Sequence, residues 1–159
     1  MKSSVVWMVV ACAGVALAGE KKIARTAVPQ PVLAAIAKHF PSARQLGFAR
    51  EEDKGKVIFE AHLQDGARRL DVDVTPDGKL AAVEETIAPD AAPEAVRKGV
   101  AASKYAKATV MKAEKVQSYE DDKVASTAYE FVVRAKHQKV EIVLDEAGKI
   151  VKEEPLGND

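Results

Sequence analysis

The side chains that most often carry catalysis or bind metals are sparse in this sequence and poorly spaced for either task. The chain has 3 histidines, His39, His62 and His137, and no two of them are three or four residues apart. A zinc or transition-metal site needs three or four converging nitrogen, sulfur or oxygen ligands. No Gly-x-Ser-x-Gly elbow, glycine-rich phosphate loop or dinucleotide motif is present. The sequence therefore predicts no enzyme, no cofactor and no metal site.

Acidic residues at alternate positions of the predicted strands are the strongest candidates for a binding site. Side chains of a strand alternate between its two faces, so the polar residues that alternate with Phe59, Leu70 and Val72 lie opposite the core. We expect one exposed acidic patch with a histidine inside it, extending into the second half of the chain. The candidate partner-binding residues are Glu60, His62, Asp71, Asp73, Glu130, Arg134 and Glu141. The alternative is a solvated sheet face without a partner.

Two similar stretches, residues 70–80 and 140–150, supply the framework for these residues. Each alternates apolar and polar side chains, passes through a turn that ends in Gly-Lys, and enters a second strand. In the first stretch the turn is Pro76-Asp77-Gly78, whose residue types suit a tight turn. Gly148 takes the place of Gly78 in the second stretch. The pattern predicts equivalent turns at both glycines, with Val72 and Ile142 buried under helices.

One helix and four strands are predicted in each half of the chain. The first helix begins near Val28 and ends at Phe40, because a following proline disfavours the helical region. Strands follow at about residues 45–52, 56–63, 68–75 and 79–86, and again at about 109–119, 126–135, 139–144 and 149–153 after a second helix. Short turns leave no room for helical crossovers, so the strands pair antiparallel. We predict an α+β fold of two tandem repeats, each with one helix packed on a four-stranded antiparallel sheet.

The beginning of the chain is typical of a secretory signal peptide. Lys2 precedes an apolar run, and Ala16-Leu17-Ala18 fits the small-residue cleavage pattern. We therefore predict a signal peptide at 1–18, a flexible N-terminus at 19–27, repeats at 28–87 and 88–154, and a tail at 155–159. The predicted location is the periplasm or the medium, with no membrane span after cleavage. Lipid anchoring through Cys12 is the less favoured alternative, because apolar residues continue beyond it.

The balance of charge excludes one class of partner. The chain has 24 Lys and Arg residues and 24 Asp and Glu residues, for a formal net charge of 0. Nucleic-acid-binding domains usually show a basic excess, so no nucleic-acid partner is expected. The single cysteine lies in the predicted signal peptide, so the exported chain would fold without disulfides.

Several short motifs carry a resemblance to a known family. Val28-Pro29, Phe40-Pro41-Ser42-Ala43 and the run from Val72 to Asp77-Gly78-Lys79-Leu80 resemble the PepSY-like family of exported bacterial proteins. The second half departs from that pattern, with Lys104-Tyr105 near the position of the Phe-Pro pair. The tandem arrangement is also similar to the architecture of the beta-lactamase-inhibitory protein. The resemblance implies a periplasmic or secreted binding module, in some cases one that inhibits hydrolases.

These observations together favour an exported, non-catalytic binding module. Its expected partner is an envelope or secreted protein or peptide, held on the exposed sheet face. The alternative is an envelope protein that binds or senses a small ligand or a metal ion. A pocket with converging polar groups would favour that alternative.

Overall fold

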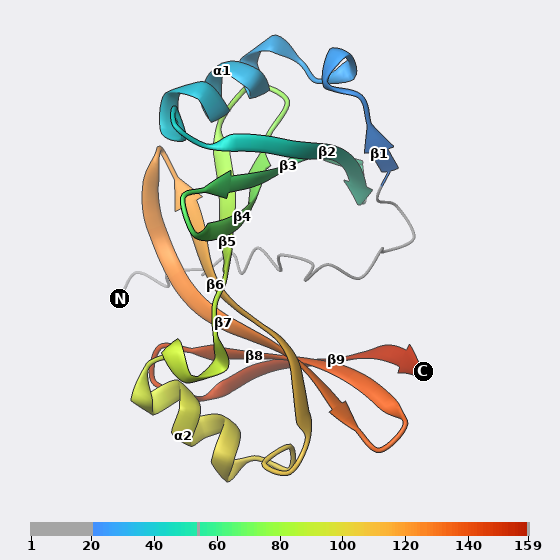
Figure 1. Ribbon diagram of the computed structural model, residues 1–159, viewed down its shortest axis with the longest axis vertical. Helices are drawn as coiled ribbons and strands as arrows, with labels where there is room; N and C mark the ends of the chain where they lie inside the picture. Colours follow the sequence, from blue (N-terminus) through green and yellow to red (C-terminus); the bar gives the residue numbers. More distant parts are fainter. Residues whose placement is uncertain (1–20, 54, 159) are drawn as a thin grey trace, which may run out of the picture.

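The computed structural model describes residues 21–53 and 55–158, and these form one antiparallel sheet with two α-helices (Figure 1). The predicted signal peptide and Cys12 lie outside the described residues. The first half contains β1 (Lys21–Ile23), a 3-10 turn (Arg25–Ala27), α1 (Gln30–His39), β2 (Arg44–Asp53), β3 (Lys56–Asp65), β4 (Arg68–Val74) and β5 (Leu80–Thr86). The second half contains a 3-10 turn (Pro89–Ala91), α2 (Glu94–Ala102), β6 (Thr109–Glu120), β7 (Lys123–Ala135), β8 (Gln138–Asp145) and β9 (Ile150–Asn158).

The strands follow one another across a 9-stranded sheet in the order of the sequence, and every neighbouring pair is antiparallel. The α+β class is therefore confirmed. Four strands follow each helix, but they are consecutive parts of a single sheet. The link is the pairing of β5 with β6, in which residues 82–86 lie opposite residues 114–118. The sequence analysis did not anticipate this pairing.

Both ends of the described chain belong to the sheet, which corrects two sequence predictions. Residues 21–27 were expected to be flexible, yet Lys21–Ile23 pairs with β2 through Lys21–Arg50 and Ile23–Phe48. The predicted tail from residue 155 instead continues β9 as far as Asn158. A strand edge without a neighbour carries unpaired backbone donors and acceptors. β1 pairs with part of the edge of β2, and the end of β9 pairs with β8.

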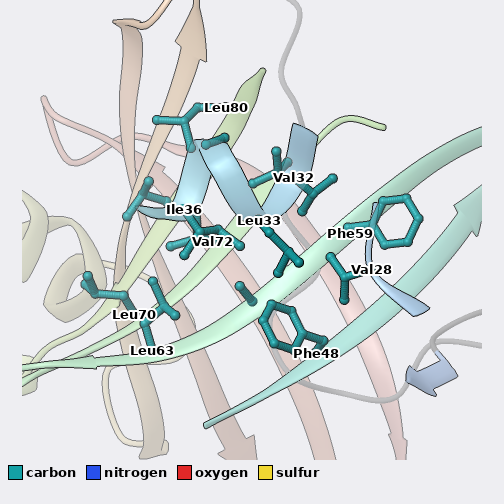
Figure 2. Close-up of a cluster of buried hydrophobic side chains, with 14 residues drawn as sticks. Val28, Val32, Leu33, Ile36, Phe48, Phe59, Leu63, Leu70, Val72 and Leu80 are labelled. Carbon is teal, nitrogen blue, oxygen red and sulfur yellow. The ribbon is translucent and has the colours of Figure 1, made fainter. Parts of the chain in front are cut away.

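Two apolar cores hold the helices to one face of the sheet. Val32 and Ile36 of α1 lie over Val72, which is 0% exposed, in the first core (Figure 2). Val96 of α2 belongs to a second core with Ile142, also 0% exposed. The predicted burial of Val72 and Ile142 is confirmed. Val83 of the first core lies directly opposite Gln117 on β6. Gln117 points to the same side of β6 as Ala113, which belongs to the second core. Both helices therefore cover the same face.

A β-bulge in β2 places Leu46 and Phe48 differently from the shared face that simple alternation would predict. The register of β2 against β3 shifts between Gln45 and Gly47. The extra residue, Leu46, points outward and is 44% exposed, whereas Phe48 is buried. Bulges commonly re-aim a side chain in this way.

The predicted equivalence of Gly78 and Gly148 is confirmed by their turns. Gly78 has φ of 87° and donates its N–H to Thr75 at 2.8 Å; Gly148 has φ of 81° and donates to Asp145 at 2.9 Å. Each turn also packs against the helix of its own half. A Cβ added at Gly78 would lie 2.7 Å from the Pro31 carbonyl oxygen, and one at Gly148 would lie 2.1 Å from that of Ala95. Both positions need glycine for conformation and for space.

The hairpin of β6 and β7 joins the two halves a second time, because its tip reaches α1 (Figure 1). Lys38 Nζ lies 2.7 Å from Asp122 Oδ2, and His39 Nε2 lies 3.6 Å from Asp122 Oδ1. Tyr119 near the tip packs against the first apolar core. His39, the last residue of α1, is half-buried.

Candidate functional site

The face of the sheet opposite the helices carries carboxylates along its whole width. Alternation along each strand turns them away from the apolar cores, as in β3 and β4, where Phe59, Ala61 and Val72 point to the helices. We call this side the acidic face. Its carboxylates are Glu60, Asp71, Asp73, Glu84, Glu114, Glu130, Glu141 and Glu154. Two lysines, Lys112 and Lys152, lie on the same face.

Several of these acids lie directly opposite one another on neighbouring strands. The register places Glu60 opposite Asp73, Asp71 opposite Glu84, Glu114 opposite Glu130, and Glu141 opposite Glu154. Facing residues in an antiparallel pair have their Cβ atoms about 4.5–5.5 Å apart, and like charges in that position destabilise the sheet. Lys152 bridges the last of these pairs, because its Nζ lies 3.2 Å from Glu141 Oε1 and 2.5 Å from Glu154 Oε2. The opposition of the other pairs carries a folding cost.

The predicted histidine inside an acidic group is present in the first half. His62 Nδ1 lies 2.7 Å from Asp71 Oδ1 and 3.4 Å from Glu60 Oε1, and all three residues are half-buried. One ligating atom from each lies within 4.8 Å of the others. A hollow of about 270 Å³ lies beside His62 and Asp71. Its wall also includes Leu46, Arg69, Thr86 and Lys112.

Asp73 is surrounded by other acids on the same face. Burial, followed by the charges of Glu60, Glu51 and Asp71, raises the pKa of Asp73 well above its ordinary value of 3.8, and His62 opposes the shift. Burial and the neighbouring negative charges each disfavour the charged carboxylate. The first-half group therefore combines half-exposed acids with one whose proton is hard to remove.

The middle of the acidic face is more deeply buried than its first-half part. Glu84, Glu114 and Glu130 are 5%, 1% and 3% exposed, and one carboxylate oxygen of each lies within 4.8 Å of the others. Burial, followed by Asp73, raises the pKa of Glu84 to about 11. Burial, followed by Glu141 and Glu114, raises that of Glu130 to about 8. Lys112 Nζ, 2.8 Å from Glu114 Oε1, supplies a nearby positive charge.

The burial of Glu130 and Glu141 corrects the prediction that they belong to an exposed patch. Each is 3% exposed, and Val132 and Val143 on the same face are buried as well. The sheet twists strongly along its length (Figure 1). Alternation assigns a side chain to one face of the sheet, but it does not show whether neighbouring side chains on that face cover it. Lys152 Nζ lies 3.2 Å from Glu141 Oε1, whereas Arg134 is exposed near the end of β7.

The sequence analysis missed two central members of this face, Glu84 and Glu114. Both lie on strands that it predicted, and their alternation with Val83 and Ala113 was visible. Their proximity depends on the β5–β6 pairing, which places Glu114 opposite Thr86, two residues beyond Glu84. The alternation within each strand therefore indicated which face Glu84 and Glu114 occupy. It did not indicate that the two strands are neighbours.

Within residues 21–53 and 55–158, no helix has the length and apolar character needed to cross a membrane.

Solved bacterial structures share this fold. One is a BLIP-like protein from Bacteroides fragilis, with a TM-score of 0.66 and 22% identity over 82% of this chain and 89% of that one. Another is described as a "putative periplasmic" protein from Bacteroides eggerthii, with a TM-score of 0.69 and 23% identity over 80% of this chain and 88% of that one. No curated protein matches the sequence. The sequence does match, over residues 4–82 and 57–152, the family described as "Putative beta-lactamase-inhibitor-like, PepSY-like", and this chain therefore belongs to the PepSY-like family.

Proposed function

We propose that this protein is a non-catalytic binding module whose acidic face holds a basic segment of a protein or peptide. The observation that carries the proposal is the set of acids that oppose one another across the strands, such as Glu60 with Asp73 and Asp71 with Glu84. Lysine or arginine at one member of each pair would be more favourable for the sheet. Cationic groups supplied by a partner would offset the repulsion that the isolated protein bears.

The first half offers the more accessible part of this surface. Glu60 and Asp71 are half-buried, and Asp71 and Leu46 line the hollow together with the cations Arg69 and Lys112. An arginine of the partner can bind a carboxylate through two parallel hydrogen bonds, and its apolar stem can lie against Leu46. The hollow of about 270 Å³ is below the usual range of about 300–1,000 Å³ for small-molecule sites. Its size therefore favours a side chain over a larger free ligand.

The comparisons support an exported protein with a protein partner. The family description refers to beta-lactamase inhibitors, and a structural neighbour is described as periplasmic. An enzyme inhibitor needs a complementary surface and no catalytic group of its own. We therefore infer that the partner is an envelope or secreted protein, with a hydrolase as one example.

The test is a panel of extended peptides of equal length with basic, neutral or acidic side chains. Fluorescence anisotropy would measure their binding in a chelator at two salt concentrations. Basic peptides should bind, and more weakly at higher salt, because exposed charges are screened beyond about 10 Å at 0.1 M. The Glu60→Gln/Asp71→Asn variant should lose this binding. The control Asp90→Asn/Glu94→Gln makes the same charge change at exposed residues near α2 and should retain it.

Two results would contradict the proposal. One is equal binding of basic and acidic peptides by the wild-type protein. The other is equal loss of binding in both double variants, which would attribute the interaction to overall charge.

A further inference from the structure

We propose that Glu84, Glu114 and Glu130 bind one hard divalent cation where the two halves of the sheet meet. This inference goes beyond the proposed function, because the site is complete within the chain and needs no protein partner. Its geometry comes from three neighbouring strands. Glu84 lies on β5 of the first half, whereas Glu114 and Glu130 face each other on β6 and β7 of the second half. One carboxylate oxygen from each lies within 4.8 Å of the others.

Two oxygens in this group have no bonding partner within the protein. Oε2 of Glu114 and Oε2 of Glu130 are buried and accept no hydrogen bond. The residues themselves are 1% and 3% exposed. Leaving a buried polar atom unsatisfied costs about 1–3 kcal/mol, and more when it is charged. A ligand that supplies positive charge to these oxygens would remove this cost.

The neighbouring cation does not balance the group. Lys112 Nζ lies 2.8 Å from Oε1 of Glu114, which leaves Oε2 of Glu114 and Oε2 of Glu130 without a partner. A divalent ion placed among the three residues would contact all of them together. It would also connect β5 to β6 and β7, the strands whose pairing joins the halves.

The donor set selects the kind of ion. All three side chains offer carboxylate oxygen, which suits Ca²⁺, Mg²⁺ or Mn²⁺, whereas structural zinc prefers cysteine and histidine. Calcium binds oxygen at about 2.3–2.6 Å, so oxygens on opposite sides of the ion would be about 4.6–5.2 Å apart. The 4.8 Å limit within this group therefore accommodates a calcium-sized ion, and water can complete the coordination.

The second acidic group, Glu60, His62 and Asp71, serves as the internal comparison. Its members are half-buried, and His62 Nδ1 already lies 2.7 Å from Asp71 Oδ1. An unpartnered buried oxygen is found in the central group and not in this one, among the residues that the structure describes. We therefore assign the ion to the central group.

The test begins with chelator-treated protein, titrated separately with Ca²⁺, Mg²⁺ and Mn²⁺. Isothermal titration calorimetry should show one saturable site per chain for at least one ion, and that ion should raise the unfolding temperature. Glu130→Gln should weaken ion binding by roughly 10–100-fold or more, because that is the loss when a residue that only supports a metal ligand is changed. Glu130 would itself be a ligand. Glu60→Gln is the matched control and should bind the ion as the wild type does.

A purely structural role for Glu130 predicts a different pattern. In the absence of metal, Glu130→Gln should be at least as stable as the wild type, because it replaces a buried carboxyl that faces Glu114 and has an unpartnered oxygen. A structural role would instead lower its stability whether or not the ion is present. If Glu130→Gln does not fold, Glu84→Gln replaces it and is compared with the same control, Glu60→Gln.

The proposal is overturned if none of the three ions binds at millimolar concentration, or if Glu60→Gln rather than Glu130→Gln loses the ion. Neither result would affect the proposed function, because peptide binding is measured in a chelator. Conversely, loss of peptide binding in Glu60→Gln/Asp71→Asn leaves the central site unchanged.

Discussion

The two faces of this sheet are built on opposite physical principles. On the helix side, apolar side chains such as Val72, Val133 and Ile142 are completely buried in two cores. On the acidic face, carboxylates oppose one another and some are buried without a bonding partner. Apolar burial stabilises the folded chain, whereas opposed and buried acids destabilise it. The helix side therefore supplies the stability that offsets the cost of the acidic face.

The largest expected effect is on the helix side. Ile142→Ala removes apolar atoms from a site that is 0% exposed. It should lower the free energy of unfolding by about 2–5 kcal/mol, the range for such a cavity. Denaturant unfolding at neutral pH would measure it. A loss below about 0.5 kcal/mol, a value typical of surface positions, would contradict the burial of Ile142 in the core.

On the acidic face a substitution should act in the opposite direction. Asp73→Asn removes a carboxyl whose pKa is raised by burial and by the acids around it, namely Glu60 and Asp71 on the neighbouring positions and Glu51 on β2. The folded protein holds this proton to higher pH than the unfolded chain does. The stability contributed by the protonated form is thus fully present below pH 3.8 and is lost as pH rises through the folded pKa.

Unfolding curves measured from acid to neutral pH would show this effect. The variant should be more stable than the wild type at neutral pH, and the difference should disappear toward pH 3.8. The exposed substitution Asp90→Asn is the control. A variant that is less stable than the wild type at neutral pH would show that the charged Asp73 stabilises the fold.

The smallest expected effect concerns the contact between the hairpin tip and α1. Lys38 Nζ and Asp122 Oδ2 are 2.7 Å apart, but both side chains are largely solvent-exposed. Exposed ion pairs contribute about 0.2–1 kcal/mol, so Lys38→Ala should cost no more than that, and less at high salt. A double-mutant cycle with Asp122→Asn would isolate the pair. A coupling above about 2 kcal/mol would make the tip a main support of the fold.

The sequence predicted the local features of both faces. Alternation correctly separated Phe59 from Glu60 and Val72 from Asp73, and the Gly-Lys pattern located the turns at Gly78 and Gly148. Each of these features depends on residues that are neighbours in the chain. They follow from side-chain periodicity and from the conformational freedom of glycine.

The features that were missed depend on distant parts of the chain. The β5–β6 pairing joins strands that are separated by α2, and without it the proximity of Glu84 to Glu114 cannot be derived. The burial of Glu130 and Glu141 follows from the twist of the whole sheet, and the bulge at Leu46 from a local register shift. Periodicity within one strand carries no information about its neighbours.

NMR mapping of a bound basic peptide would show whether the acidic face binds it. Backbone amide chemical shifts of labelled protein would be recorded by NMR during titration with an arginine-containing peptide in a chelator. The largest chemical-shift changes should lie on β3 and β4 around Glu60, His62 and Asp71, and the shifts of α1 and α2 should change little. Changes concentrated on the helices, or no changes at all, would contradict the assignment of binding to the acidic face.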